Sequence, residues 1–355
     1  MTRRAWRAPL MVAALLSLTW GVWLGLLRIG WALPLPWPDQ LILHGPLMIG
    51  GFLGTLIGIE RAIGLARPWA YAGPLASASG ALLLVFGPSG PAGPVLITIG
   101  SGIMTVVFIT IVRRQPSLFA STMLIGAAAW LTGNILWTEG FAIYRVVFWW
   151  TTFLVLTIAG ERLELNRLLR PTRLVRITFV VAVAIVVGAA CAIAWWPSDG
   201  VRAMGIGLSA LCTWLAVNDI ARRTIHRPGL PRYVAVCLLA GYLWLGIAGM
   251  IAAATGVFDP GPVHDATLHA IFLGFAVSMI FGHAPIVFPA ITGRPVPYRR
   301  SLYGPVALLH ASVAVRVTGD LFEDLARIRS WGGLLNAAAL VWFVVTVAAA
   351  SANQK

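Results

Sequence analysis

Long apolar stretches alternate with short polar connections along the whole chain. The stretches are continuously apolar instead of alternating in polarity, which favours helices over the strands of a membrane barrel. Most are close to the roughly 20 residues that a helix needs to cross about 30 Å of hydrocarbon. Twelve stretches can be delimited, and they cover residues 9–31, 40–60, 69–86, 93–112, 117–137, 140–161, 173–196, 202–221, 232–255, 264–288, 302–318 and 330–350.

This pattern predicts an all-α polytopic membrane protein with about 12 transmembrane helices. The connections are short, so residues 1–355 are expected to form a single transmembrane helical domain. Composition agrees, because only 11% of the residues are charged, against roughly 25% in soluble domains. The first stretch follows basic residues, as in a signal peptide. It continues without a small-residue cleavage site, so we interpret it as a retained span.

The net charge of +14 would suit a nucleic-acid partner, but its distribution argues against one. The basic residues form short clusters between apolar stretches, with no long basic tail. If the N-terminus is cytoplasmic, a large majority of the 26 Lys and Arg residues fall on the cytoplasmic side, as the positive-inside rule requires. We therefore predict the cytoplasmic membrane, both termini in the cytoplasm, the lipid bilayer as partner, and no nucleic acid.

A faint similarity recurs every four spans. The spans at 40–60, 140–161 and 264–288 are each followed by an Arg-Pro pair, and the first two end on Glu-Arg. The Glu-Arg pairs are Glu60-Arg61 and Glu161-Arg162. The pattern fits three pseudo-repeated four-helix units, or independent use of Pro to end helices and Arg to anchor them. The four charged residues could be structural ion pairs or part of a proton path.

Two histidines occupy matched positions in different spans. His44 follows Asp39 by five residues, and His269 follows Asp265 by four, where the acidic residues should mark the outer boundary. At about 1.5 Å per residue, both histidines should lie roughly 6–8 Å below the outer surface. They could be the axial ligands of one haem, ligands of a metal ion, or hydrogen-bonded structural residues. Asp265 shares a helix face with His269 and could orient its ring through Nδ1.

The other histidines are expected elsewhere. His283 lies about 21 Å from His269 along one helix, so the two cannot serve one centre. His283 and His310 should lie toward the cytoplasmic side, where they could form a second metal site or a proton path. His264 is expected to be a solvated boundary residue, and His226 a solvated residue of a basic loop.

Three arginines lie in the predicted outer loop, on the side of His44 and His269. They are Arg316, Arg327 and Arg329. Guanidinium groups pair well with carboxylates, so they could hold haem propionates. The alternative is pairing with acidic residues of the same loop, which are Asp320, Glu323 and Asp324. No C-x-x-C-H motif for covalent haem attachment occurs, so any haem is expected to be b-type. The three cysteines are expected to be small core residues.

The arrangement of spans and histidines resembles subunit I of the haem-copper oxidases. The stretch HDATLHAIFLGFAVSMIFGHAP, followed by TGR, is more similar to the NnrS-like membrane proteins, which bind haem and copper and are linked to nitric oxide. The resemblance implies that His44 and His269 hold a low-spin haem, with arginines of the last outer loop near its propionates. The chain departs from the oxidases because its sixth and seventh spans lack the histidines that hold copper there.

We therefore expect a haem-binding membrane protein without an oxidase-type copper centre, acting in electron transfer or in handling nitric oxide. Bound copper stays open, as does enzymatic activity, and a redox partner or a quinone is the expected partner. Two other classes stay open. The chain could be a proton-coupled transporter or channel, or a cofactor-free partner of a respiratory complex.

Overall fold

The computed structural model describes residues 7–35, 37–87, 90–169 and 171–352. These residues fold into helices joined by short connections, and they contain no β-strand. Eleven helical segments in the described part are long and apolar enough to cross a membrane. The prediction of an all-α polytopic membrane protein is confirmed at this level.

The eleven candidate spans match eleven of the twelve predicted stretches. They are α1 (Arg7–Arg28), η1 to α3 (Pro38–Leu65), η3 with α4 (Pro68–Phe86), α5 (Ala92–Arg114), α6 (Leu118–Thr138), α7 (Ile143–Asn166), α8 (Arg173–Ala192), α9 (Pro197–Asn218), α11 (Leu230–Thr255), α12 to α13 (Pro262–Thr292) and most of α15 (Ala326–Ala352). The predicted span 302–318 corresponds to α14 (Tyr303–Leu321), which is 19 residues long and is not among the eleven. Three polar side chains, His310, Arg316 and Asp320, make α14 less hydrophobic than its neighbours.

Local signals explain where several helices begin and end. The hydroxyls of Ser117 and Thr172 accept main-chain N–H groups in the first turns of α6 and α8, as N-cap residues do. Gly256 ends α11 in the left-handed conformation, with φ 62°, which glycine adopts without steric cost. Short helical turns fill the connections. They are η4 (Arg167–Leu169), α10 (Ala221–Thr224), η6 (Arg300–Leu302) and η7 (Glu323–Leu325).

The chain forms two compact units. Unit 1 is drawn from Met1–Phe153 and Val287–Arg294, and unit 2 from Leu154–Ile286 and Pro295–Lys355. Helix α7 therefore begins in unit 1 and ends in unit 2, and the last residues of α13 belong to unit 1. The expectation of a single transmembrane domain stays a prediction.

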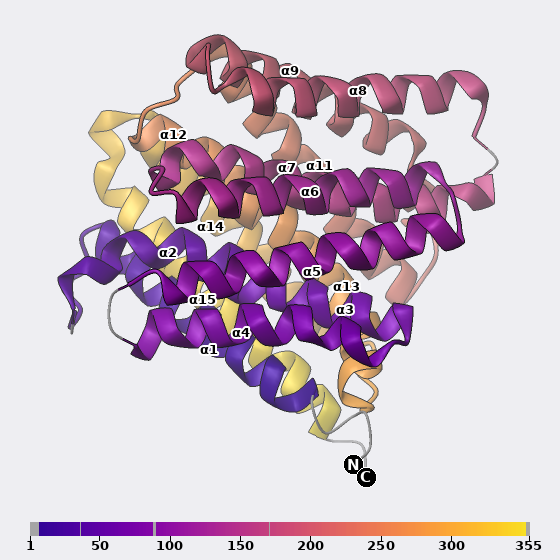
Figure 1. Ribbon diagram of the computed structural model, residues 1–355, viewed down its shortest axis with the longest axis horizontal. Helices are drawn as coiled ribbons and strands as arrows, with labels where there is room; N and C mark the ends of the chain where they lie inside the picture. The colour runs from indigo at the N-terminus through magenta and orange to yellow at the C-terminus, as the bar shows by residue number, and fades with distance from the viewer. Residues whose placement is uncertain (1–6, 36, 88–89, 170, 353–355) are drawn as a thin grey trace. The chain divides into compact units, whose positions relative to one another are not determined.

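Unit 1 is held together by close helix contacts and a small apolar core. α4 (Ala72–Phe86) and α5 lie side by side (Figure 1). A Cβ atom added at Gly80 would lie 2.7 Å from the carbonyl oxygen of Gly93, so glycine allows these two backbones to touch. Elsewhere in the unit, Leu10, Ile59 and Ile291 pack in one buried cluster, which joins α1 and α3 to the end of α13.

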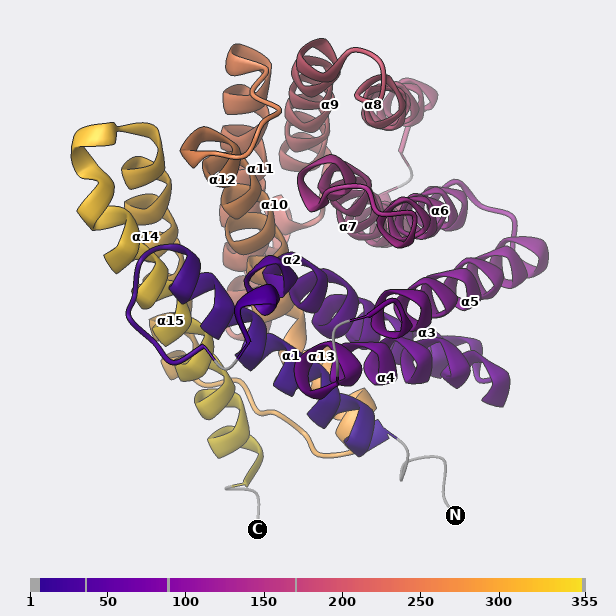
Figure 2. The same cartoon turned by 60° about the vertical axis from the view of Figure 1, so that its left-hand side comes forward.

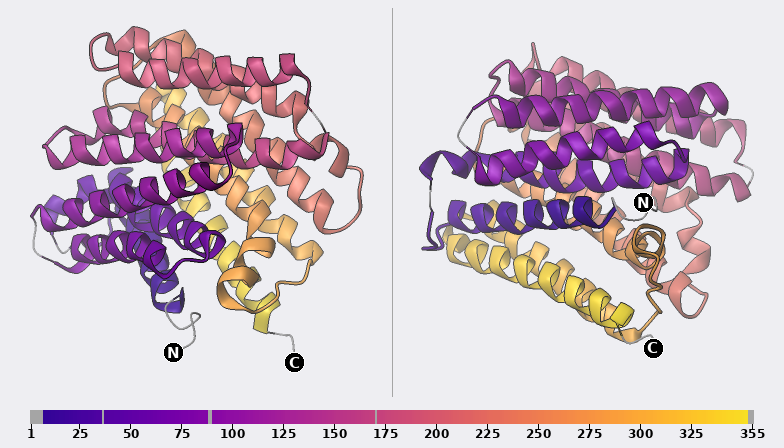
Figure 3. Two further views of the ribbon diagram at one scale, coloured as in Figure 1. Left: turned by 45° about the vertical axis from the view of Figure 1, so that its right-hand side comes forward. Right: turned by 60° about the horizontal axis from the view of Figure 1, so that its bottom comes forward.

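Unit 2 is built from helix pairs. The α8–α9 pair can be followed in Figure 3, and Figure 2 shows α14 beside α15. A Cβ atom at Gly332 would lie 2.6 Å from the main-chain nitrogen of Arg316, so α15 approaches the backbone of α14 at this glycine. The rings of Phe281 and Phe343 stack with centroids 3.7 Å apart and join α13 to α15.

Two spans contain a π-helical segment of eight residues. These segments are η2 (Leu47–Gly54) and η5 (Ala270–Val277). Each starts directly after a short α-helix that carries a histidine, either α2 (His44–Pro46) or α12 (Pro262–His269). π-Helical turns pair residue i with i+5, are rare, and occur mostly at functional sites. This feature therefore marks His44 and His269 independently of their predicted depth.

Three glycines of the second span pack against three different helices. Gly50, Gly54 and Gly58 approach α5, α6 and α4 respectively. The side chains that they meet are Ile97, Trp130 and Pro74. These glycines therefore allow close approach to three neighbouring helices.

Candidate functional site

His44 lies half-buried against α1. Its Nδ1 is 2.7 Å from the carbonyl oxygen of Gly21. A carbonyl only accepts, so Nδ1 carries the proton and Nε2 carries the lone pair of the neutral ring. A Cβ atom at Gly25, one turn along α1, would lie 2.9 Å from Cε1 of His44. The two glycines therefore provide both the acceptor and the space that orient this ring.

His269 has the same arrangement within unit 2. Its Nδ1 is 2.7 Å from the main-chain oxygen of Asp265, so Nε2 again carries the lone pair. Asp265 thus accepts from the ring through its backbone. Its carboxylate Oδ2 instead lies 3.7 Å from Nη2 of Arg316. Nε2 is a usual metal-binding atom of histidine, and a hydrogen bond at Nδ1 is the usual way of orienting the ring.

His310 uses both ring nitrogens in hydrogen bonds. Nδ1 accepts the indole hydrogen of Trp244 at 3.0 Å, which leaves the ring proton on Nε2. Nε2 is 3.3 Å from Oγ of Ser278, which donates to the carbonyl of Cys237 at 2.7 Å. Ligation of a metal by His310 would break one of these bonds, so the local geometry favours a structural role.

His283 is also bonded at both nitrogens. Nδ1 donates to the carbonyl oxygen of Met279 at 2.8 Å, and Nε2 lies 3.4 Å from Nη1 of Arg162. The second metal site and the proton path predicted for His283 and His310 stay predictions. Either role would have to begin from the hydrogen bonds described above. Within the described ranges, no group of three or more His, Cys, Asp or Glu side chains could hold a metal ion.

Arg162 is the centre of a buried ion pair that sequence reasoning missed. Its Nε and Nη2 lie 2.7 Å and 3.1 Å from the two carboxylate oxygens of Asp219. The side chains are 3% and 1% exposed, so the pair is fully enclosed. Asp219 Oδ1 also accepts the main-chain N–H of Ala221, which ties the turn after α9 to the end of α7. A lone carboxylate at the end of an apolar run was the only sequence signal.

The arginines predicted for haem propionates are partly engaged by protein carboxylates. Asp320 forms ion pairs with Nε of Arg316 at 2.8 Å and Nε of Arg329 at 3.2 Å, and its own side chain is fully buried. Arg327 is exposed. Internal pairing, the alternative weighed from sequence, is therefore present for two of the three arginines. The side chain of Glu323 lies outside the described part of the structure.

The Glu-Arg pairs differ from each other. Glu60 and Arg61 form an ion pair at 3.1 Å, with side chains 36% and 15% exposed. Arg162 instead pairs with Asp219, and Glu161 is half-buried. The proton path predicted for these four residues stays a prediction.

The family match extends over nearly the whole chain. The family described as "Domain of unknown function (DUF8744)" matches residues 7–352. The chain belongs to this family. No curated protein sequence matches the chain. Both histidine-bearing spans and the buried ion pairs lie within the residues that the DUF8744 family matches.

Two sequence expectations for this DUF8744 chain are wrong. His264, expected to be solvated, is 4% exposed, because it lies in the first turns of α12 on a side that packs inward. Cys191, expected in the core, is exposed on α8. Cys237 is buried as predicted. In an apolar span, polarity alone does not show which helix faces meet protein and which meet lipid.

Proposed function

We propose that the protein is a membrane haem protein in which His44 and His269 each supply an axial ligand through Nε2. The observation that supports this is the repeated local device. In both cases a main-chain carbonyl holds Nδ1–H, and a π-helical segment begins within three residues of the histidine. The ring orientation and tautomer that ligation needs are thus fixed by the protein itself.

Bis-histidine ligation suits electron transfer. A bound b-type haem would supply reversible one-electron chemistry at iron, with potential tuned by the ligands and the buried surroundings. The chain would hold the two rings, limit access of water and place charge nearby. Arg329, whose side chain is 24% exposed, and the exposed Arg327 are the outer-loop cations best able to meet a propionate. We propose electron exchange with a redox partner or a quinone as the activity.

An absorption spectrum of purified protein tests the proposal. We expect a Soret band and the α and β bands of a six-coordinate low-spin haem. If both histidines bind one haem, His44→Ala and His269→Ala should each abolish the low-spin spectrum. If each histidine binds a separate haem, each variant should lose about half of the haem absorbance. His226→Ala, a change at an exposed loop residue, is the matched control. Colourless protein after expression with excess haem would overturn the proposal and favour the transporter or channel alternative.

We also propose that α14 is the twelfth span, and that both termini lie on the cytoplasmic side of the cell membrane. The π-helical segments after His44 and His269 lie in the second and tenth spans, a spacing of two four-helix units, while the sixth span, α7, is α-helical throughout. Single cysteines placed at positions 226 and 327, in a chain with Cys191, Cys212 and Cys237 replaced, test the topology. An impermeant maleimide added to intact cells should label position 327 and spare 226.

A further inference from the structure

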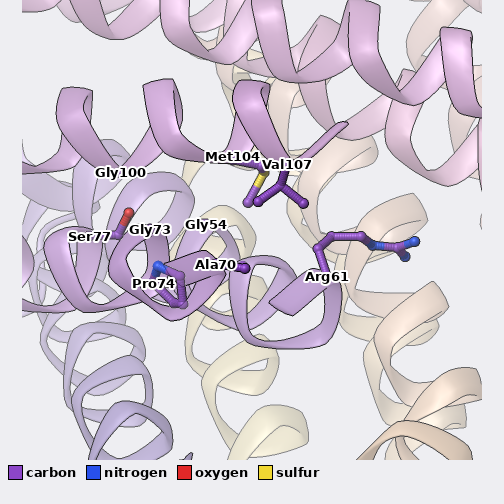
Figure 4. Close-up of a pocket in the computed structure, with 10 residues that line it drawn as sticks. Gly54, Arg61, Ala70, Gly73, Pro74, Ser77, Gly100, Met104 and Val107 are labelled. Atoms are coloured by element: carbon purple, nitrogen blue, oxygen red, sulfur yellow. The ribbon is translucent and has the colours of Figure 1, made fainter. Parts of the chain in front are cut away.

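A small cavity lies inside unit 1, where α3 (Thr55–Leu65), α4 and α5 meet. Its volume is about 10 Å³, close to what one water molecule requires. Four glycines line it, among them Gly73 and Gly100. Figure 4 shows that these residues come from neighbouring helices. The glycines let these helices approach closely around the cavity, because a Cβ atom at Gly100 would lie within 3.0 Å of α4.

Ser77 gives this cavity a polar wall. The residue is 1% exposed, and its Oγ has no hydrogen-bond partner among the described residues. Leaving a buried hydroxyl without a partner is unfavourable, so a ligand that satisfies it is favoured. By contrast Ser101, equally buried on α5, donates to the carbonyl of Thr98 at 2.7 Å.

A main-chain acceptor lies in the same space. The carbonyl oxygen of Gly73 is 3.0 Å from where a Cβ atom of Gly100 would stand, and Oγ of Ser77 is closer still. One guest could therefore meet a hydroxyl and a carbonyl at once. A water molecule needs two to four polar partners to be held, and an apolar guest would leave the Ser77 hydroxyl unsatisfied.

Arg61 lies at the other end of the cavity. In Figure 4 its guanidinium points away from Ser77 and from the other labelled residues, while its aliphatic stem follows the cavity wall. The guanidinium contacts Oε1 of Glu60 at 3.1 Å and Sδ of Met123 at 3.9 Å. These contacts hold the guanidinium away from Ser77, while Arg61 remains one of the residues that line the cavity.

We propose that this cavity binds one water molecule, held by Ser77, and that the Arg61 side chain closes the end through which the water exchanges. This water molecule would place one more polar group beyond Glu60 and Arg61, inside the apolar interior. The inference does not depend on haem binding, because every residue involved lies in unit 1 and His44 is not among the residues that line the cavity.

Radiolytic footprinting of the full-length protein tests the site. Short X-ray pulses generate hydroxyl radicals from bound water, and these oxidise side chains beside it. Met104 lines the cavity and is 3% exposed, whereas Met204 of α9 is 1% exposed and does not line it. We expect Met104 to oxidise several-fold faster than Met204. Equal rates for the two would show a dry cavity and overturn the proposal.

Variants test the two named roles. Ser77→Ala should slow Met104 oxidation several-fold, and the matched control Ser101→Ala should leave it unchanged. Arg61→Ala should speed it, because bulk water would reach the cavity, while Arg113→Ala, at an exposed position on α5, should not. Unchanged oxidation in Ser77→Ala overturns the role of Ser77, and unchanged oxidation in Arg61→Ala overturns the closure. Thermal melting of each variant confirms that it is folded.

Discussion

Trp244 donates its indole hydrogen to Nδ1 of His310, and this bond determines which nitrogen of His310 carries the proton. The ring then donates to Ser278, which donates to a carbonyl of α11. The chain of hydrogen bonds joins α11, α13 and α14 within unit 2. A histidine used in this way stabilises the helix packing without binding a cofactor.

Replacing His310 should therefore affect stability and spare the haem. His310→Phe leaves the indole N–H of Trp244 buried without an acceptor, so we expect a loss of about 1–3 kcal/mol in the free energy of unfolding. Unfolding in detergent, followed by circular dichroism, measures this loss. The Soret band should stay at its wild-type position. Loss of that band from protein that still melts cooperatively would make His310 a ligand.

The buried ion pair makes a strong stability prediction. Asp219→Leu leaves Arg162 without its counter-charge, and we expect a loss of about 3–5 kcal/mol. The double variant Arg162→Met, Asp219→Leu should recover much of that loss, because no uncompensated charge remains. The control is Asp199→Asn, which breaks an exposed pair with Arg202 and should cost about 0–1 kcal/mol. A double variant less stable than Asp219→Leu alone would contradict this explanation.

The acidic residues near α12 should differ in their effects. Asp320 is fully buried between two arginines, so Asp320→Asn should destabilise unit 2 strongly. Asp265→Asn should cost about 0–1 kcal/mol, because its side chain is 22% exposed and 3.7 Å from Arg316. It should also keep the haem spectrum, since His269 bonds to the main chain. A spectral shift in Asp265→Asn would show that the carboxylate orients the ring.

The glycine beside His44 gives a test of ring placement. A Cβ atom at Gly25 would lie 2.9 Å from Cε1 of His44, so Gly25→Ala must displace the ring or α1. Such overpacking typically costs about 1–3 kcal/mol, and a displaced ligand should shift or weaken the low-spin spectrum. Gly64→Ala, where an added Cβ meets nothing within 4 Å, is the control. Identical spectra and melting for both variants would argue against this placement of His44.

The length and polarity of the apolar runs were enough to predict most of the spans. α14 shows the limit of that signal, because His310, Arg316 and Asp320 lower its hydrophobicity while their partners are supplied by the folded protein. The choice between π- and α-helical turns in η2 and η5 is likewise invisible in composition. It depends on a one-residue shift in hydrogen bonding, which packing against neighbouring helices decides.

The sequence was better at showing which residues belong to the candidate site than at showing which groups they bond to. The sequence singled out His44, His269 and Asp265, and it placed Asp265 next to His269. It could not show that the backbone of Asp265, and not its carboxylate, accepts the hydrogen bond, because both acceptors belong to one residue. Gly21 and Asp219 were missed since their roles depend on residues far along the chain. The matched depth of the two histidines stays a prediction, because they belong to different units.

The pair of Arg162 and Asp219 also sets an order of assembly. The two residues are 57 positions apart, with all of α8 between them. Because Asp219 is made 57 residues after Arg162, the guanidinium leaves the ribosome before its counter-ion does. A cation in that position stays near the headgroups or the walls of the insertion channel. The end of α7 therefore settles late in biogenesis, together with the hairpin of α8 and α9 that brings its carboxylate.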